Sequence, residues 1–203
     1  MGLRPFVSGV GAIVTLHHVR PARPDLFQPN RLLEITPRFL DDVLNELRGS
    51  DVDLVSLDEI HRRLVEGDFA RRFVSVTIDD GYRDTLQWAY PILRRHQAVY
   101  IPTSFPDRLG ELWWLVLEAV VARNDEIHVA MTGEEETLCC AGVAGKRAAF
   151  DRVYGWLRSL ATEDELRAVV RALAERYHVN IAAVCDELCM GWDELKTLAA
   201  TRW

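Results

Sequence analysis

The sequence has no surplus of basic residues and no apolar run long enough to cross a membrane. Its 203 residues include 24 lysines and arginines against 31 aspartates and glutamates, which leaves a formal net charge of -7. Nucleic-acid binding needs a basic surface that neutralises phosphates, so this balance argues against a nucleic-acid partner. The first apolar run, residues 10–16, is shorter than a membrane span and lacks the flanks of a signal peptide. We therefore expect no membrane association and a cytoplasmic protein.

Cysteines at metal-binding spacing are also missing. The four cysteines are Cys139, Cys140, Cys185 and Cys189, and no Cys-x-x-Cys occurs among them. This spacing does not favour a zinc site, so we expect reduced and mostly buried thiols. The sequence contains no internal repeat and no low-complexity run. With 49% hydrophobic and 27% charged residues it has the composition of a globular protein, and we expect a single domain over residues 1–203.

The most informative stretch is an acid pair behind a buried strand. Residues 73–78 read Phe-Val-Ser-Val-Thr-Ile, a mixture of apolar and β-branched side chains that is typical of a buried strand. Asp79 and Asp80 follow, and then Gly81, which tolerates positive φ. Ligands bind at the carboxyl ends of strands in α/β proteins, and two adjacent carboxylates need a cation or donors nearby to ionise together. Capping of a turn is the alternative, since Asp-Asp-Gly is common in turns.

Residues 76–84, Val-Thr-Ile-Asp-Asp-Gly-Tyr-Arg-Asp, resemble the first motif of the polysaccharide deacetylases. This carbohydrate esterase family includes the chitooligosaccharide deacetylases of the nodulation type. In that family the first aspartate of the pair is the general base and the second is a ligand of a divalent metal, usually zinc. The resemblance therefore implies that Asp79 is the catalytic base and that Asp80 is a metal ligand.

Further segments resemble the same family. Residues 16–19, Leu-His-His-Val, are similar to the Tyr-His-Arg-Val pattern of its first strand, and this similarity implies that His17 lines the site. A structural, hydrogen-bonded role is the simpler interpretation of His18. Residues 112–114 and 192–195 are similar to a segment of one family branch and to the helix before the second motif. That motif, His-x-x-x-His with the other two metal ligands, does not occur, and neither do the later motifs with a substrate-binding arginine and the catalytic acid. The resemblance thus covers only the front part of the family's domain.

The front part of the sequence, residues 1–110, alternates strands and helices. We expect strands at 11–19, 52–55, 73–78 and 98–101, with helices that begin after Thr36 and Ser56. Glu59 completes a capping box with Ser56, and Asp84 caps the helix behind the acid pair. Such alternation predicts an α/β fold with a parallel sheet. The resemblance implies a partial, distorted (β/α) barrel.

The back half, residues 111–203, is predicted to be a mostly helical insertion with a hairpin. Residues 112–121 are apolar almost all round, which indicates a buried helix. Residues 127–131 and 137–140 flank the loop of the hairpin. Thr162 and Glu165 form a capping box for a later helix.

The resemblance implies a hydrolase that removes acetyl groups from an N-acetylated oligo- or polysaccharide with the help of zinc. The alternative is a truncated or decayed, non-catalytic relative, because the sequence lacks the histidine pair and the catalytic acid. We expect for this reason that the chain alone does not deacetylate chitooligosaccharides at a useful rate. A phosphotransferase of the haloacid dehalogenase kind is rejected, since it needs Asp-x-Asp and Gly81 stands two residues after Asp79. A barrel left open at one side also predicts a homodimer through that side.

Overall fold

The computed structural model describes residues 9–94, 106–107, 110–131 and 133–200. The contacts divide the chain into two compact units. Unit 1 contains Met1–Ala22, Leu33–Thr103 and Met190–Trp203, and unit 2 contains Arg23–Leu32 and Ser104–Cys189. The sequence pattern divides the chain into a front part, residues 1–110, and a back part, residues 111–203, and this division stays a prediction. None of the helices in the described ranges is long and apolar enough to cross a membrane.

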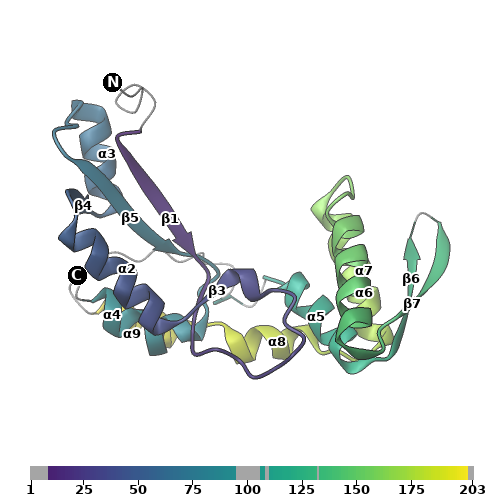
Figure 1. The fold of residues 1–203 in the computed structure, drawn as a ribbon. Helices are drawn as coiled ribbons and strands as arrows, with labels where there is room; N and C mark the ends of the chain where they lie inside the picture. The colour runs from purple at the N-terminus through teal and green to yellow at the C-terminus, as the bar shows by residue number, and fades with distance from the viewer. Residues whose placement is uncertain (1–8, 95–105, 108–109, 132, 201–203) are drawn as a thin grey trace. The chain divides into compact units, whose positions relative to one another are not determined.

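Unit 1 is built on a parallel sheet of three strands (Figure 1). The strands are β1 (Gly11–Leu16), β5 (Arg72–Ile78) and β4 (Val52–Leu54), in the order β1-β5-β4. The predicted α/β class with parallel strands is therefore confirmed. Within the described ranges the strands do not close into a barrel, and the strand predicted at residues 98–101 lies outside the described residues.

The first predicted strand is interrupted at His17. Beyond this residue a short strand, β2 (His18–Val19), leaves β1 and pairs in parallel with β3 (Glu34–Ile35). Arg20 extends this contact, since its N–H donates to the carbonyl oxygen of Ile35 at 3.0 Å. The end of the predicted strand thus belongs to a separate small sheet, which begins directly after His17.

The helices of unit 1 are α2 (Pro37–Gly49), α3 (Leu57–Glu66), the π-helical segment η2 (Thr85–Ala89), α4 (Tyr90–Leu93) and α9 (Trp192–Ala199). The first two begin after Thr36 and Ser56, as the sequence predicts. A short 3-10 helix, η1 (Arg31–Leu33), precedes β3. The hydroxyl of Thr36 caps α2 by accepting from the N–H of Phe39 at 3.2 Å. Pro91 cannot donate an intrahelical hydrogen bond, and the turn before it is the π-helical one.

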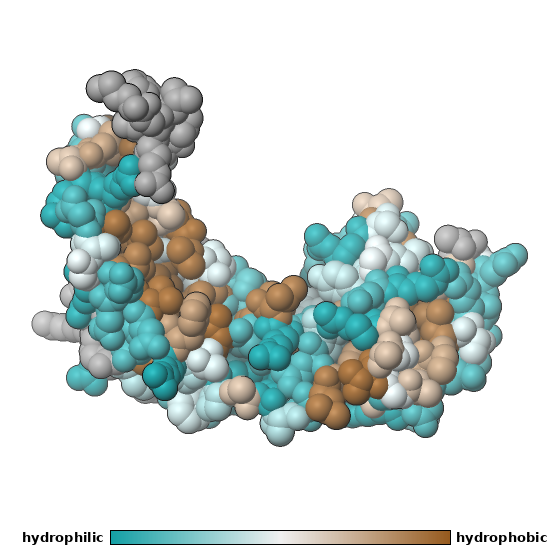
Figure 2. Space-filling model, viewed as in Figure 1, coloured by the Kyte–Doolittle hydropathy of each residue, from teal (hydrophilic) through white to brown (hydrophobic). Residues whose placement is uncertain are grey.

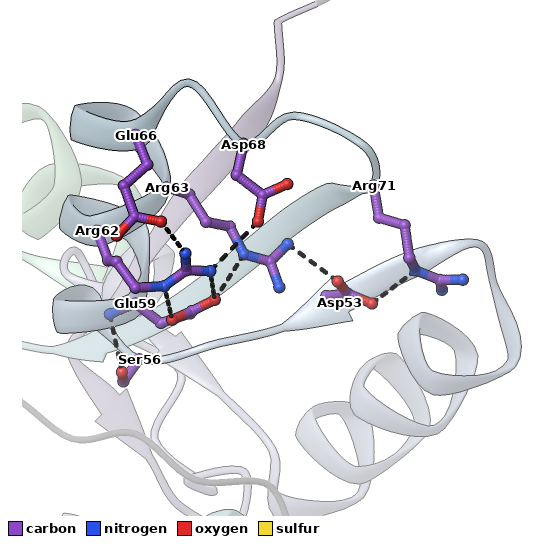
Figure 3. A network of polar contacts seen from close by, with 8 residues as sticks. All are labelled: Asp53, Ser56, Glu59, Arg62, Arg63, Glu66, Asp68 and Arg71. Carbon is purple, nitrogen blue, oxygen red and sulfur yellow. Dashed lines mark hydrogen bonds and ion pairs between the residues drawn. The ribbon is translucent and has the colours of Figure 1, made fainter.

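The expected capping box of α3 is only half present. Ser56 accepts from the N–H of Glu59 at 3.2 Å, as predicted. The Glu59 carboxylate, however, accepts hydrogen bonds from Arg62 and Arg63, and it takes part in the surface network of Figure 3. These two guanidinium groups lower the pKa of Glu59 to about 2. Two cations one turn along the helix compete with the single backbone N–H, which explains why the box is not completed.

The core of unit 1 lies between the sheet and two helices. Its buried members are Val19, Leu40, Leu44, Val76, Ile78, Ala89, Ile92 and Leu93. Val76 and Ile78 point to the same side of β5, because successive side chains of a strand alternate. Leu40 and Leu44 are one turn apart on α2, which places them on one helix face. This packing holds the carboxyl end of β5 in place.

Unit 2 is helical with one hairpin. Its elements are α5 (Trp113–Arg123), β6 (Glu126–Met131), β7 (Glu134–Cys139), α6 (Gly142–Leu157), α7 (Glu163–Arg176) and α8 (Ile181–Leu188). The predicted capping box of α7 is confirmed, with both reciprocal hydrogen bonds at 3.2 Å. The hairpin loop is shorter than predicted, because Glu134 already pairs with Met131. All four cysteines are free, and each of them except Cys139 is buried.

Candidate active site at the rim of the parallel sheet

The pairing of β1 with β5 brings the first site residues to one rim of the sheet. The last paired residues are Leu16 and Ile78, so the residues that follow them, His17 and Asp79, leave the sheet side by side. The N–H of Asp79 donates to the carbonyl oxygen of Leu16 at 2.8 Å and extends the ladder by one bond. Both side chains are half-buried. The rim on which the sequence places the site is thus formed by the carboxyl ends of two parallel strands.

The turn behind the acid pair has an unusual backbone. Asp80 has a φ of 66° and Gly81 a φ of 62°, so two successive residues are left-handed. A residue with a Cβ pays roughly 1–2 kcal/mol for this conformation, although aspartate tolerates it better than most. The carbonyl oxygen of Gly81 accepts from the N–H of Met190 at 2.9 Å. This contact fastens the turn to the start of the C-terminal segment of unit 1.

The C-terminal helix α9 supports the turn through an ion pair. Arg83 donates to both carboxylate oxygens of Glu194, at 2.8 and 3.2 Å. Glu194 also accepts from the N–H of Gly191 at 3.0 Å. Both interactions lower the pKa of Glu194, the contact with Arg83 most of all, while burial acts in the opposite direction. The residue next to the acid turn is therefore held by a two-pronged charged contact.

Asp84 does not cap the helix that follows it, contrary to the sequence prediction. Its side chain makes no capping hydrogen bond. One carboxylate oxygen, Oδ2, lies 2.6 Å from Nδ1 of His18, and the other lies 3.5 Å from the backbone nitrogen of Val19. The Asp84 carboxylate is thus occupied by the His18 ring and the Val19 backbone at the end of the first strand, and the predicted helix cap is wrong. The histidine for which we expected a structural role is thus bound to the acid motif.

His18 is also held by an aromatic contact. Its ring stacks on Tyr82, with 3.6 Å between the ring centroids and 19° between the planes. Both rings are buried, and only 2% of His18 is exposed. Sequence reasoning missed Tyr82 and the role of Asp84 because both contacts join residues that are far apart in the chain. The available signal was the second histidine at the end of the first strand.

Burial sets the electrostatics of Asp80. It raises the pKa of this carboxyl group above the ordinary value, and the neighbouring Asp79 raises it further. The nearby His17, Tyr82 and His18 lower the pKa and offset part of this effect, with His17 acting most strongly. A half-buried carboxylate with a second carboxylate beside it ionises more readily when a cation is near.

The donors at the rim suit a divalent cation in type but not in number. Asp80 offers a carboxylate, and His17 and His18 offer imidazoles, which zinc accepts as ligands. Nε2 of His18 is buried and has no hydrogen-bond partner among the described residues. The described ranges contain no group of three or more candidate side chains already gathered around one point. The structure thus places the predicted ligand Asp80 beside histidines without assembling a complete ligand set.

Neither a protein-family model nor a curated protein matches this chain. The solved structures that resemble part of it include two deacetylases. The Streptococcus pyogenes deacetylase PplD in complex with acetate has 24% sequence identity and a TM-score of 0.41, over 47% of this chain and 43% of that chain. A de-N-acetylase from Aggregatibacter actinomycetemcomitans has 17% identity and a TM-score of 0.42, over 62% of this chain and 60% of that chain. The chain therefore spans less than two thirds of either protein.

Proposed function

We propose that the rim of the sheet is the acid half of a metal-dependent de-N-acetylase site of the polysaccharide deacetylase type, which acts on N-acetylated sugars. The observation that supports this proposal is the placement of Asp79 and Asp80 at the carboxyl end of a buried parallel strand, with His17 on the neighbouring strand end. The resemblance of residues 76–84 to the first family motif supplies the reaction class. The partial, distorted (β/α) barrel belongs to the same proposal.

The two carboxylates have different tasks in this proposal. Asp79 accepts a proton from the water that attacks the acetamide carbonyl, as a general base. Asp80 holds the cation, and His17 lines the site on the other strand. A zinc ion bound there would polarise the carbonyl and lower the pKa of its water from near 16 to about 7. The departing amine needs a proton from an acid, and the described residues include none that matches the catalytic acid of the family.

A non-catalytic binding protein is the second candidate. Catalytic zinc sites use three protein ligands and keep one position open for water. The described residues do not form such a group of three. A chain with this rim could therefore hold an N-acetylated sugar or a cation without hydrolysing the amide. This candidate shares the site with the first and differs from it only in turnover.

Zinc binding and amine release, measured side by side, test both candidates. We expect wild-type protein to bind zinc in calorimetry and Asp80→Ala to bind it at least about tenfold more weakly. Asp151→Asn, an exposed position on α6, is the control and should bind like wild type. Protein that is folded but does not bind zinc would contradict the proposed metal site.

Amine release then tests whether this acid half of the site is sufficient for turnover. The substrate is a set of N-acetylglucosamine oligomers, incubated with zinc or cobalt. A missing base or acid typically costs about a hundred- to ten-thousandfold in rate, so we expect the chain alone to release amine no faster than Asp79→Asn. Release that both Asp79→Asn and Asp80→Ala abolish would reject the non-catalytic candidate. It would also mean that residues outside the described set complete the site.

A further inference from the structure

His18, whose ring is bound to the acid motif, has a buried nitrogen atom with no hydrogen-bond partner among the described residues. Its Nδ1 lies 2.6 Å from the Asp84 carboxylate, which can only accept, so Nδ1 carries the hydrogen. In a neutral imidazole the other nitrogen, Nε2, then holds the lone pair. This Nε2 is buried and finds no donor among the described residues. A buried polar atom without a partner is destabilising, so a group bound at Nε2 would stabilise the fold.

The ring that carries this nitrogen is fixed on two sides. Asp84 holds one edge through a hydrogen bond, and Tyr82 covers one face by stacking. A histidine that donates one N–H to a carboxylate and presents the other nitrogen is the usual arrangement of a metal-binding imidazole. The carboxylate behind the ring fixes its orientation and makes Nε2 a stronger donor to the metal. A hydrogen bond that served only the fold would not require this second nitrogen to stay bare.

We propose that His18, oriented by Asp84, is a ligand of the divalent cation that Asp80 holds at the rim. The inference rests on the proposed function and adds a ligand that the family resemblance does not assign, since the matching family position is an arginine. The cation belongs to the later first-row transition metals, such as zinc or cobalt, because imidazole suits these metals whereas calcium and magnesium prefer oxygen ligands. Asp84 is then a positioning residue that acts through His18.

Zinc titration of matched variants tests this assignment. His18→Phe keeps a ring that can stack on Tyr82 but removes the lone pair. Asp84→Asn leaves the imidazole in place and weakens its orientation, and loss of such a supporting group typically costs about 10–100-fold in metal affinity. We expect His18→Phe to lose at least as much as Asp84→Asn. His61→Phe, an exposed position on α3, should bind zinc like wild type. Circular dichroism checks that each variant is folded.

Nitrogen NMR of the histidine side chains gives a second measurement that does not depend on activity. In the free protein we expect His18 to show a protonated Nδ1 and an unprotonated Nε2. Added zinc should shift the Nε2 signal of His18 in wild type but not in Asp80→Ala. A purely structural His18 would keep its Nε2 signal unchanged when zinc binds. This readout remains usable even if His18→Phe fails to fold, because it uses the wild-type ring.

The outcomes separate this inference from the proposed function. If Asp80→Ala weakens zinc binding while His18→Phe and the Nε2 signal stay unchanged, His18 is not a ligand and the proposed function stands. If only the signals of His17 move, the inference is likewise overturned. If wild-type protein binds no zinc, both the inference and the metal site of the proposed function fail.

Discussion

At the scale of single residues, the acid turn depends on a glycine that no side chain can replace without strain. Gly81 is buried and left-handed, and it directly follows a residue that is itself left-handed. Its neighbours on either side, Asp80 and Tyr82, are both placed by the conformation of this one peptide. A change at Gly81 therefore acts on the site through the backbone rather than through a lost contact.

We expect Gly81→Ala to lower the free energy of unfolding by at least about 1 kcal/mol, because alanine at positive φ is strained. Gly155→Ala is the matched control. Gly155 lies within α6, has open space where a Cβ would stand, and should gain about 0.5–1 kcal/mol from the better helix former. Urea denaturation of the two variants gives the comparison. Equal effects of the same sign at both glycines would show that backbone conformation does not control the acid turn.

At the scale of secondary-structure elements, the ends of helices could be predicted from short sequence patterns. Two helix starts follow from patterns of at most four residues, and the structure confirms both. They are Thr36 before a proline, and Thr162 with Glu165. The hydrogen bond of His18 to Asp84 could not be predicted in this way. It joins residues 66 positions apart, and a carboxylate placed near a helix start suits a cap equally well. The buried strand at residues 73–78 could be predicted from its composition. Composition does not give the order of the strands in the sheet, so it does not say that β1 lies beside this strand at the rim.

The contacts of the segment Arg23–Leu32 could not be predicted from local sequence patterns either. This segment lies in the chain between β2 and β3 of unit 1, but its contacts assign it to unit 2. Glu118, buried within the apolar helix α5, accepts from Arg23 at 3.1 Å and from Asn30 at 2.7 Å. A carboxylate on a buried helix face needs donors, and this distant segment supplies them. Helix periodicity identifies the buried face but does not say which part of the chain covers its polar residue.

The support that α9 gives to the acid turn makes stability depend on pH in a defined direction. The pKa of Glu194 in the folded protein is lower than the value of 4.5 expected for a free glutamate. The ionised carboxylate therefore stabilises the fold fully above 4.5, and the contribution disappears as the pH falls through the lower folded pKa. The pair with Arg83 is partly exposed, which limits its contribution to about 0.5–1 kcal/mol.

Glu194→Gln should accordingly lower the free energy of unfolding by about 0.5–1 kcal/mol at neutral pH. Wild type and variant should converge in acid, below the folded pKa of Glu194. Urea denaturation over a series of pH values measures this difference. Arg167→Gln, which removes an exposed ion pair on α7, is the control for general charge effects. A loss in Glu194→Gln that is the same at every pH would show that the carboxylate charge has no part in holding the turn.

At the scale of the whole molecule, the sheet of unit 1 leaves apolar surface exposed. Among the described strands β1 stands at one end of the order, and large side chains along and next to it are open to solvent: 38% of Val10, 55% of Ile13 and 43% of Val14. Figure 2 shows apolar residues gathered on this part of the molecule. The strand contains no charged residue and no proline, the two features by which edge strands commonly avoid pairing. Two copies could thus pair along β1 without bringing like charges together.

We expect the chain to self-associate through this edge, with an apparent mass in light scattering that rises with protein concentration. Ile13→Lys should reduce the association, because a lysine on the edge would place two like charges opposite each other in a symmetric pair. Val65→Lys, at an exposed apolar position on α3, introduces the same charge away from the edge and should associate like wild type. A mass that stays at one chain for wild type over the whole concentration range would contradict the prediction. An equal loss of association in both variants would assign it to net charge rather than to pairing along β1.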